Sequence, residues 1–180
     1  MRIKREECTA LIIDIQEKLY PVMAEKEALV TNCIKLLQGF AALNIPTIFS
    51  QQYTKGLGAT IPEISSLYPS FSYIEKQSFS CMDEPDCVHL LEQTGKSIVL
   101  ICGIESHVCV LQTAIDLQEK GYQPVVISDC ISSRNLTEKQ IALNRFSQEG
   151  IRISTVESIL FELTRSASAA EFKAISKIIK

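Results

Sequence analysis

The stretch SIVLICGIESHVCVLQTAIDLQEKGYQPVVISD, residues 97–129, decides the fold. It opens with the uninterrupted apolar run Ile98–Cys102, which is typical of a strand buried on both faces of a parallel sheet. A helical pattern follows Cys109 and ends at Gly121, and a second apolar run, Pro124–Ile127, predicts the next strand. The stretch therefore predicts a strand–helix–strand unit that carries a thiol where the chain passes from sheet to helix.

The flanking sequence continues this alternation of strands and helices. We expect further strands at residues 8–14, 45–50, 72–76 and 151–154, and helices at 24–43, 84–94, 136–149, 156–163 and 169–179. Residues 51–69 are expected to form a long loop that walls a site, and residues 129–133 a polar loop. This order predicts an α/β fold with a mainly parallel sheet covered on both faces, in a single domain that spans residues 1–180.

The composition limits the class of protein. A chain of 180 residues with 46% hydrophobic and 22% charged residues is typical of a soluble globular protein. The net charge of -3 argues against a nucleic-acid partner. No segment approaches the roughly 18 consecutive apolar residues of a membrane span, so we expect no membrane partner. Seven cysteines form an odd set without a signal-peptide pattern, which predicts reduced thiols and a cytoplasmic location.

A metal site is not expected. The chain has only two histidines, which argues against a site with several histidine ligands. Cys102, His107 and Cys109 look superficially like a zinc cluster, but Cys102 belongs to the predicted strand and a fourth ligand is missing. We therefore expect neither a metal nor another cofactor.

Three reactive side chains stand at or just beyond the ends of predicted strands: Asp14, Lys76 and Cys109. A thiol nucleophile needs a base to take its proton and a positive group to stabilise the thiolate. A helix N-terminus can lower the pKa of a cysteine from about 8.5 to roughly 3.5–7.5, so Cys109 is a candidate thiolate. The alternatives are a small buried cysteine, an aspartate that caps the following loop, and an ordinary surface lysine.

The motifs resemble a known superfamily. The segments ALIIDIQEKLYP, EKQSFS and ICGIESHVCVLQTAIDLQEKGYQPVVISDCISSR resemble the isochorismatase-like cysteine hydrolases, in the same order along nearly the whole chain. The segment QQYTKGLGATIPEI resembles the subgroup called isochorismatase domain-containing proteins. The resemblance implies a Rossmann-like, three-layer α/β/α sandwich with a six-stranded, mainly parallel sheet.

The same resemblance implies roles for individual residues. Asp14 corresponds to the general base, Lys76 to the group that stabilises charge, and Cys109 to the nucleophile. It also implies a cis peptide bond between Ile104 and Glu105. That bond would aim the backbone N–H groups of Glu105 and Cys109 at one developing oxyanion.

The implied activity is hydrolysis of a small amide or related C–N substrate. Cys109 would attack the carbon, an amine or ammonia would leave, and water would release the thioester. The first alternative is a catalytically silent small-molecule-binding or scaffold protein that keeps the hydrolase fold. A weaker alternative is a redox-responsive thiol protein. We also expect a homo-oligomer, because the superfamily commonly assembles and the last predicted helix carries Phe172, Ile175 and Ile179. These three side chains could equally belong to the core.

The sequence departs from the nicotinamidases of this superfamily. Their metal site uses an Asp-x-His pattern and a further histidine, whereas residues 50–55 here read SQQYTK. This difference argues against nicotinamide as the substrate and leaves Gln52, Tyr53 and Phe79 as candidate pocket residues. His107 is expected to face solvent from the first turn of the helix rather than to pair with Cys109. For the loop Asp129–Arg134, a structural role and a contact with a neighbouring subunit both stay open.

Overall fold

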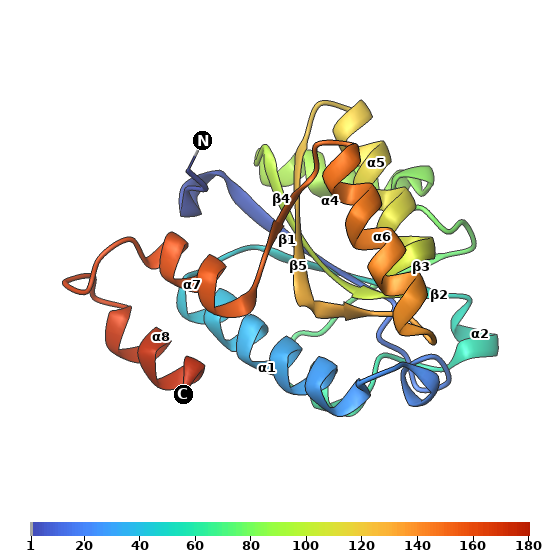
Figure 1. Ribbon diagram of the computed structural model, residues 1–180, viewed down its shortest axis with the longest axis horizontal. Coiled ribbons are helices and arrows are strands. Elements are labelled where there is room, and N and C mark those ends of the chain that lie inside the picture. Colours follow the sequence, from blue (N-terminus) through green and yellow to red (C-terminus); the bar gives the residue numbers. More distant parts are fainter. Residues whose placement is uncertain (1) are drawn as a thin grey trace.

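The computed structural model describes residues 2–180 (Figure 1). Over this range the chain forms a six-stranded, all-parallel sheet with the strand order β3-β2-β1-β4-β5-β6. The strands are β1 (Cys8–Ile13), β2 (Thr47–Gln52), β3 (Ile74–Lys76), β4 (Ile98–Ile104), β5 (Gln123–Ser132) and β6 (Arg152–Ser154). The predicted parallel sheet is confirmed.

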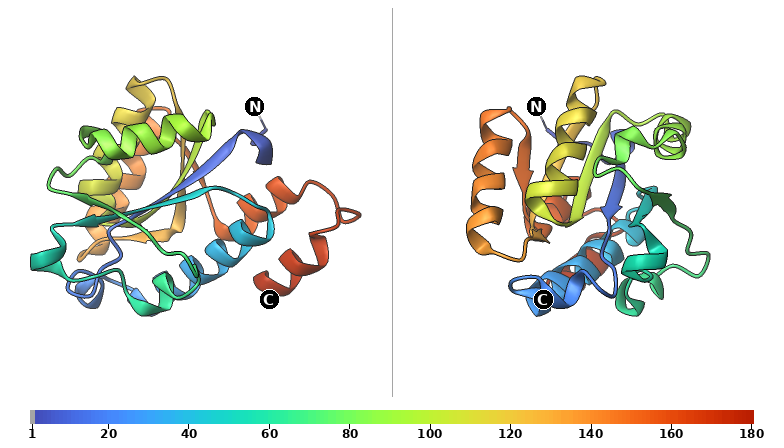
Figure 2. Two further views of the ribbon diagram at one scale, coloured as in Figure 1. Left: turned by 180° about the vertical axis from the view of Figure 1, so that it is seen from behind. Right: turned by 90° about the vertical axis from the view of Figure 1, so that its right-hand side faces the viewer.

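Helices cover both faces of the sheet. One layer holds α1 (Lys26–Ala42), α7 (Val156–Thr164) and α8 (Phe172–Ile179), and the other holds α4 (Pro85–Thr94), α5 (Leu111–Glu119) and α6 (Leu136–Gln148) (Figures 1 and 2). The arrangement is the predicted three-layer α/β/α sandwich. Among the described residues, no helix is long and apolar enough to cross a lipid bilayer.

The sheet separates two apolar cores. Ala10 and Ile12 of β1 pack in the core beneath α1, while Leu11 and Ile13 pack in the core beneath α4 and α5. Because successive side chains of a strand point to opposite faces, a strand between two cores must be apolar at every position. This requirement explains the uninterrupted apolar run of β4, all seven residues of which are buried.

The strand β2 lies two residues further along the chain than predicted. It ends at Gln52 rather than at Ser50, because parallel pairing with β3 continues through Gln51–Glu75 and Gln52–Lys76. The expected loop is therefore shorter, and it contains two four-residue helices, α2 (Thr54–Leu57) and α3 (Pro62–Ser65). As a result Gln52 lies beside Lys76 at the end of the sheet.

The strand β5 also runs further than predicted. It continues through Ser132, so the prediction of a loop at residues 129–133 is wrong. Its pairing with β4 shifts register between Ile101 and Gly103, and Cys130 and Ile131 beyond the shift are fully buried. Burial of these two side chains outweighs the small polar residues that favour a loop.

The apolar side chains of α8 belong mostly to the protein's own interior. Ile175 is fully buried, and Ile179 packs against the core beneath α1. Phe172 is half-buried, with its ring centroid 6.3 Å from that of Phe161 in α7. Of the two roles that the sequence leaves open for these side chains, an assembly surface and the core, the structure favours the core.

Gly103 allows β1 and β4 to approach each other. Its φ is +129°, and a Cβ atom there would collide with the carbonyl oxygen of Ile13. We expect Gly103→Ala to lower the free energy of unfolding by about 3 kcal/mol, because it adds backbone strain to a steric clash. Gly95→Ala is the matched control, since Gly95 also has a positive φ but no atom within 4 Å of an added Cβ. The control should lose only about 1 kcal/mol in urea unfolding, and equal losses would contradict the prediction.

Candidate active site

The carboxyl edge of the sheet brings Asp14, Lys76 and Cys109 together. Asp14 directly follows β1, and Lys76 is the last residue of β3. The Lys76 side chain reaches past the intervening strand β2, so that its Nζ lies 2.7 Å from Oδ2 of Asp14. Cys109 lies in a π-helical turn, Ser106–Val110, between β4 and α5. The ends of strands β1, β3 and β4 thus supply one cluster, as expected for a parallel sheet.

Asp14 is a fully buried carboxylate with a polar partner for each oxygen. Oδ1 accepts a hydrogen bond of 2.8 Å from the Ser50 hydroxyl, and Oδ2 faces the ammonium of Lys76. Its φ of +53° is in the left-handed region, which aspartate tolerates better than most residues. Burial raises the pKa of Asp14, while Lys76 and the hydrogen bonds oppose that rise.

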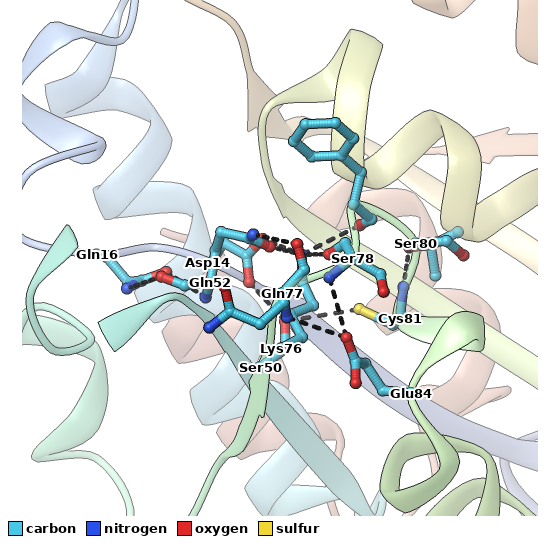
Figure 3. Close-up of polar contacts among 12 residues, drawn as sticks. Asp14, Gln16, Ser50, Gln52, Lys76, Gln77, Ser78, Ser80, Cys81 and Glu84 are labelled. Carbon is cyan, nitrogen blue, oxygen red and sulfur yellow. Dashed lines mark hydrogen bonds and ion pairs between the residues drawn. The ribbon is translucent and has the colours of Figure 1, made fainter. Parts of the chain in front are cut away.

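Lys76 is buried, and its ammonium group is surrounded by oxygen atoms. Besides the Asp14 carboxylate, Nζ contacts Oε1 of Gln52 at 2.7 Å and the carbonyl oxygens of Ser78 and Phe79 at 3.1 Å each (Figure 3). Burial acts to lower the pKa of Lys76, but the charge of Asp14 and the neighbouring thiols outweigh it, so the pKa is raised overall. Lys76 is therefore a permanent cation at neutral pH with no proton left for a further partner.

Cys109 is 7% exposed, and its thiol lies close enough to Asp14 and Lys76 for both charges to act on its pKa. Burial raises the pKa of Cys109 to about 12, the charge of Asp14 raises it further, and Lys76 opposes the rise. The lowering of the pKa that a helix N-terminus can cause is therefore outweighed, and the shift of Cys109 has the opposite direction. The direction of this shift favours the neutral thiol over the thiolate.

The peptide bond between Ile104 and Glu105 is cis, at the point where β4 leads into the turn that holds Cys109. The carbonyl of Glu105 accepts hydrogen bonds from Val108 N–H at 3.1 Å and Val110 N–H at 3.2 Å. Its carboxylate accepts two more from Arg134, from the backbone N–H at 3.0 Å and from Nε at 3.2 Å. Both ends of Glu105 are thus held next to Cys109.

The comparison with known proteins adds independent information. A family model described as the isochorismatase domain matches residues 8–158. The chain belongs to the isochorismatase family. It is 37% identical to isochorismatase domain-containing protein 2 of Danio rerio, over 99% of this chain and 89% of that protein. This relative supports the expected subgroup as well.

Solved structures agree with this assignment. A structure titled MAR1 ribonuclease from Caenorhabditis elegans is 33% identical, covers 99% of this chain and 92% of its own, and has a TM-score of 0.93. A structure from Escherichia coli, titled an octameric hydrolase of unknown specificity, is 25% identical with a TM-score of 0.92 and covers 99% of this chain and 90% of its own. This isochorismatase-family protein therefore has an isochorismatase-like hydrolase fold.

The three candidate pocket residues of this isochorismatase-family protein differ in their surroundings. Both ends of the Gln52 amide group already make hydrogen bonds within the protein. The amide oxygen accepts from Lys76, and Nε2 donates to the Gln77 carbonyl at 2.8 Å. The side chains of Tyr53 and Phe79 are 45% and 54% exposed. Tyr53 follows β2 and Phe79 follows β3, so both lie beyond the same edge of the sheet as the cluster. They keep free surface for a ligand, whereas Gln52 holds Lys76.

Residues at the end of β5 and just after it make hydrogen bonds to neighbouring elements, including the turn that holds Cys109. His107 is half-buried and shares a hydrogen bond of 2.9 Å with the Ser133 hydroxyl, so its predicted solvent-facing position is wrong. Arg134 pairs with Glu105, as described above. Asp129 accepts hydrogen bonds from Val156 N–H at the start of α7. Within this chain, Asp129 and Arg134 therefore both have structural roles.

Sequence reasoning missed three residues around the cluster: Gln16, Ser50 and Glu84. Gln16 donates to the carbonyls of Gln52 and Gly58 and accepts from the N–H of Gln52 at 2.7 Å. Ser50 could have been found, because it faces Asp14 from a neighbouring parallel strand. The two hydrogen bonds of the Glu84 carboxylate come from backbone N–H groups, and such contacts leave no pattern of residue types. No group of three or more metal-ligating side chains occurs among residues 2–180.

Proposed function

We propose that this protein is a cysteine-dependent hydrolase of a small, uncharged amide or related C–N substrate. The observation that carries the proposal is the buried Asp14–Lys76 ion pair, whose two charges both act on the neighbouring Cys109 thiol. Nucleophile, base and cation then occupy one desolvated site, as thiol chemistry requires.

The proposed reaction begins with a proton transfer. Cys109 Sγ attacks the carbonyl carbon while Asp14 takes the thiol proton. The tetrahedral intermediate expels the amine, which leaves with that proton, and a thioester remains on Cys109. Asp14 then deprotonates the attacking water, the acid is released, and the thiol is restored. Backbone N–H groups of Glu105 and Cys109 are proposed to stabilise the oxyanion in both steps.

The charges at the site favour a neutral reacting group. Asp14 and Lys76 compensate each other, and the protons of Lys76 are already used by Asp14, Gln52 and two backbone carbonyls. An anionic group next to Cys109 would meet no unpaired cation from this cluster, and it would have to lose its water. The exposed rings of Tyr53 and Phe79 are proposed to contact the remainder of the substrate.

One observation favours a second candidate, a binding protein without turnover. With a pKa of about 12, the Cys109 thiol is almost fully protonated at neutral pH. A ligand could then occupy the site without being attacked. A homo-oligomer remains part of either proposal, because the relative from Escherichia coli is described as octameric.

The test is release of amine or ammonia from a panel of small neutral amides, with an RNA oligonucleotide added because of the name of the Caenorhabditis elegans relative. Cys109→Ala should abolish turnover, and Cys8→Ala, at another buried cysteine at the start of β1, should retain it. Intact mass after acid quenching should show a hydroxylamine-sensitive acyl adduct on the native protein. Equal turnover by Cys109→Ala would refute the proposal, whereas ligand protection without product would favour the binding protein.

A further inference from the structure

We propose that Glu84 is a positioning residue for Lys76, acting through the backbone of the turn Gln77–Phe79. This inference rests on the proposed function, in which Lys76 is the cation beside Cys109. Glu84 stands immediately before α4, yet its side chain makes no capping hydrogen bond to that helix. Its carboxylate points instead to the turn that follows β3 (Figure 3).

The turn lies between two opposite charges. On one side, the carbonyl oxygens of Ser78 and Phe79 accept from Nζ of Lys76, at 3.1 Å each. On the other side, the N–H groups of Gln77 and Ser78 both donate to Oε1 of Glu84, at 3.0 Å each. The negative end of the turn therefore meets the ammonium, and its positive end meets the carboxylate. Hydrogen bonds to ionised groups are the stronger ones, so both charges hold this turn in place.

Gln52, at the end of β2, contacts both the ammonium of Lys76 and the turn Gln77–Phe79. Its Nε2 donates to the Gln77 carbonyl and its Oε1 accepts from Lys76, while Gln16 fixes its backbone. These contacts come from neutral groups. Apart from the ammonium of Lys76 itself, the charged group that contacts the turn Gln77–Phe79 in these hydrogen bonds is Glu84.

The carboxylate of Glu84 is ionised at neutral pH. The N–H groups of Ser78 and Gln77 lower its pKa, and burial opposes them only in part. If the charge were removed, the turn would lose its charge-assisted anchor and Lys76 would be held less firmly. Cys109 would then lose part of the positive charge that opposes the rise of its own pKa. The effect of Glu84 should therefore reach the thiol without any direct contact.

The experiment measures the alkylation rate of Cys109 by iodoacetamide between pH 6 and pH 10, resolved by peptide mass spectrometry. Glu84→Gln keeps the shape and one acceptor oxygen but removes the charge. We expect its Cys109 profile to move to higher pH, with alkylation at pH 8.5 slower by about tenfold, the change for one pKa unit. The matched control is Asp86→Asn, which removes an exposed carboxylate from the first turn of α4. It should leave the profile unchanged.

A second variant separates charge from shape. Glu84→Asp restores the charge on a shorter side chain and should recover part of the lost rate, although it fits less well. Equal profiles for Glu84→Gln and Asp86→Asn would overturn the proposal, and so would equal profiles for Glu84→Gln and Glu84→Asp. Thermal unfolding of each variant identifies any loss that follows from partial unfolding.

The same experiment is independent of the proposed reaction. Alkylation needs no substrate, so it reports on the electrostatics around Lys76 and Cys109 even if the protein turns nothing over. Persistent turnover by Cys109→Ala would refute the proposed hydrolase and leave the alkylation result standing. Conversely, an unshifted Glu84→Gln profile would refute the positioning role and leave the hydrolase proposal intact.

Discussion

Replacing Lys76 with methionine will lower the free energy of unfolding by about 3–5 kcal/mol at pH 7, because it leaves one member of a buried ion pair without its partner. The remaining Asp14 carboxylate is fully buried, and only the Ser50 hydroxyl still donates to it from a neighbouring strand. Urea unfolding measures the loss. Lys173→Met, at an exposed position on α8, is the control and should change stability by less than about 0.5 kcal/mol.

The pH dependence of this loss follows from the sign of the pKa shift. Without Lys76, the pKa of Asp14 rises even further above its unfolded value, because the charge that opposed the effect of burial has gone. A carboxyl group with a raised pKa binds its proton more tightly in the folded state, so its stabilising contribution is present at low pH and disappears as the pH rises. The deficit of Lys76→Met should therefore shrink as the pH falls towards 5. The double variant Asp14→Asn with Lys76→Met should recover much of the stability, and a double variant no better than Lys76→Met would contradict this account.

Replacing Asp14 with asparagine will separate the reactivity of the thiol from turnover. The charge of Asp14 is, after burial, the main cause of the raised pKa of Cys109, and Lys76 would remain to stabilise a thiolate. Alkylation of Cys109 at pH 9 should therefore become faster in Asp14→Asn. Turnover should fall by about 10²–10⁴-fold, because the substitution removes the group proposed as the general base.

Two comparisons make this result decisive. Asp86→Asn removes an exposed charge and should change neither rate. Circular dichroism must show that Asp14→Asn is folded at the temperature of the assay, since it leaves Lys76 buried without its partner. Slower alkylation in a folded Asp14→Asn protein would mean that Asp14 activates the resting thiol. That result would contradict the rise that Asp14 causes in the pKa of Cys109.

Much of the arrangement follows from the sequence because parallel strands impose strong rules. Strands buried on both faces are nearly continuous apolar runs, so β1 and β4 stand out although β1 contains the buried Thr9. The residues that follow the ends of such parallel strands must meet at one edge of the sheet. Asp14 and Cys109 could be placed together in this way. To place Lys76 beside them, one must also know that its long side chain reaches across β2 to Asp14.

The features that sequence reasoning missed depend on contacts that residue types do not record. The sequence pattern ends β2 two residues too early, so it predicts Gln52 in a loop rather than beside Lys76. Glu84 acts through backbone N–H groups, which every residue except proline provides. A helix N-terminus considered alone predicts a lowered pKa for Cys109. Burial and the charge of Asp14 outweigh this effect and raise the pKa.

The strand order has a consequence for how the protein acquires its reactive site. The ion pair joins β1 and β3, which belong to the first half of the chain, whereas Cys109 follows β4 in the second half. These halves meet where β1 pairs with β4, from Cys8 beside Ile98 to Ile13 beside Gly103. Such distant pairing is slow to form, because the intervening chain must first be closed into a loop. During synthesis and folding Cys109 therefore stays apart from Asp14 and Lys76 until the two halves of the sheet have joined.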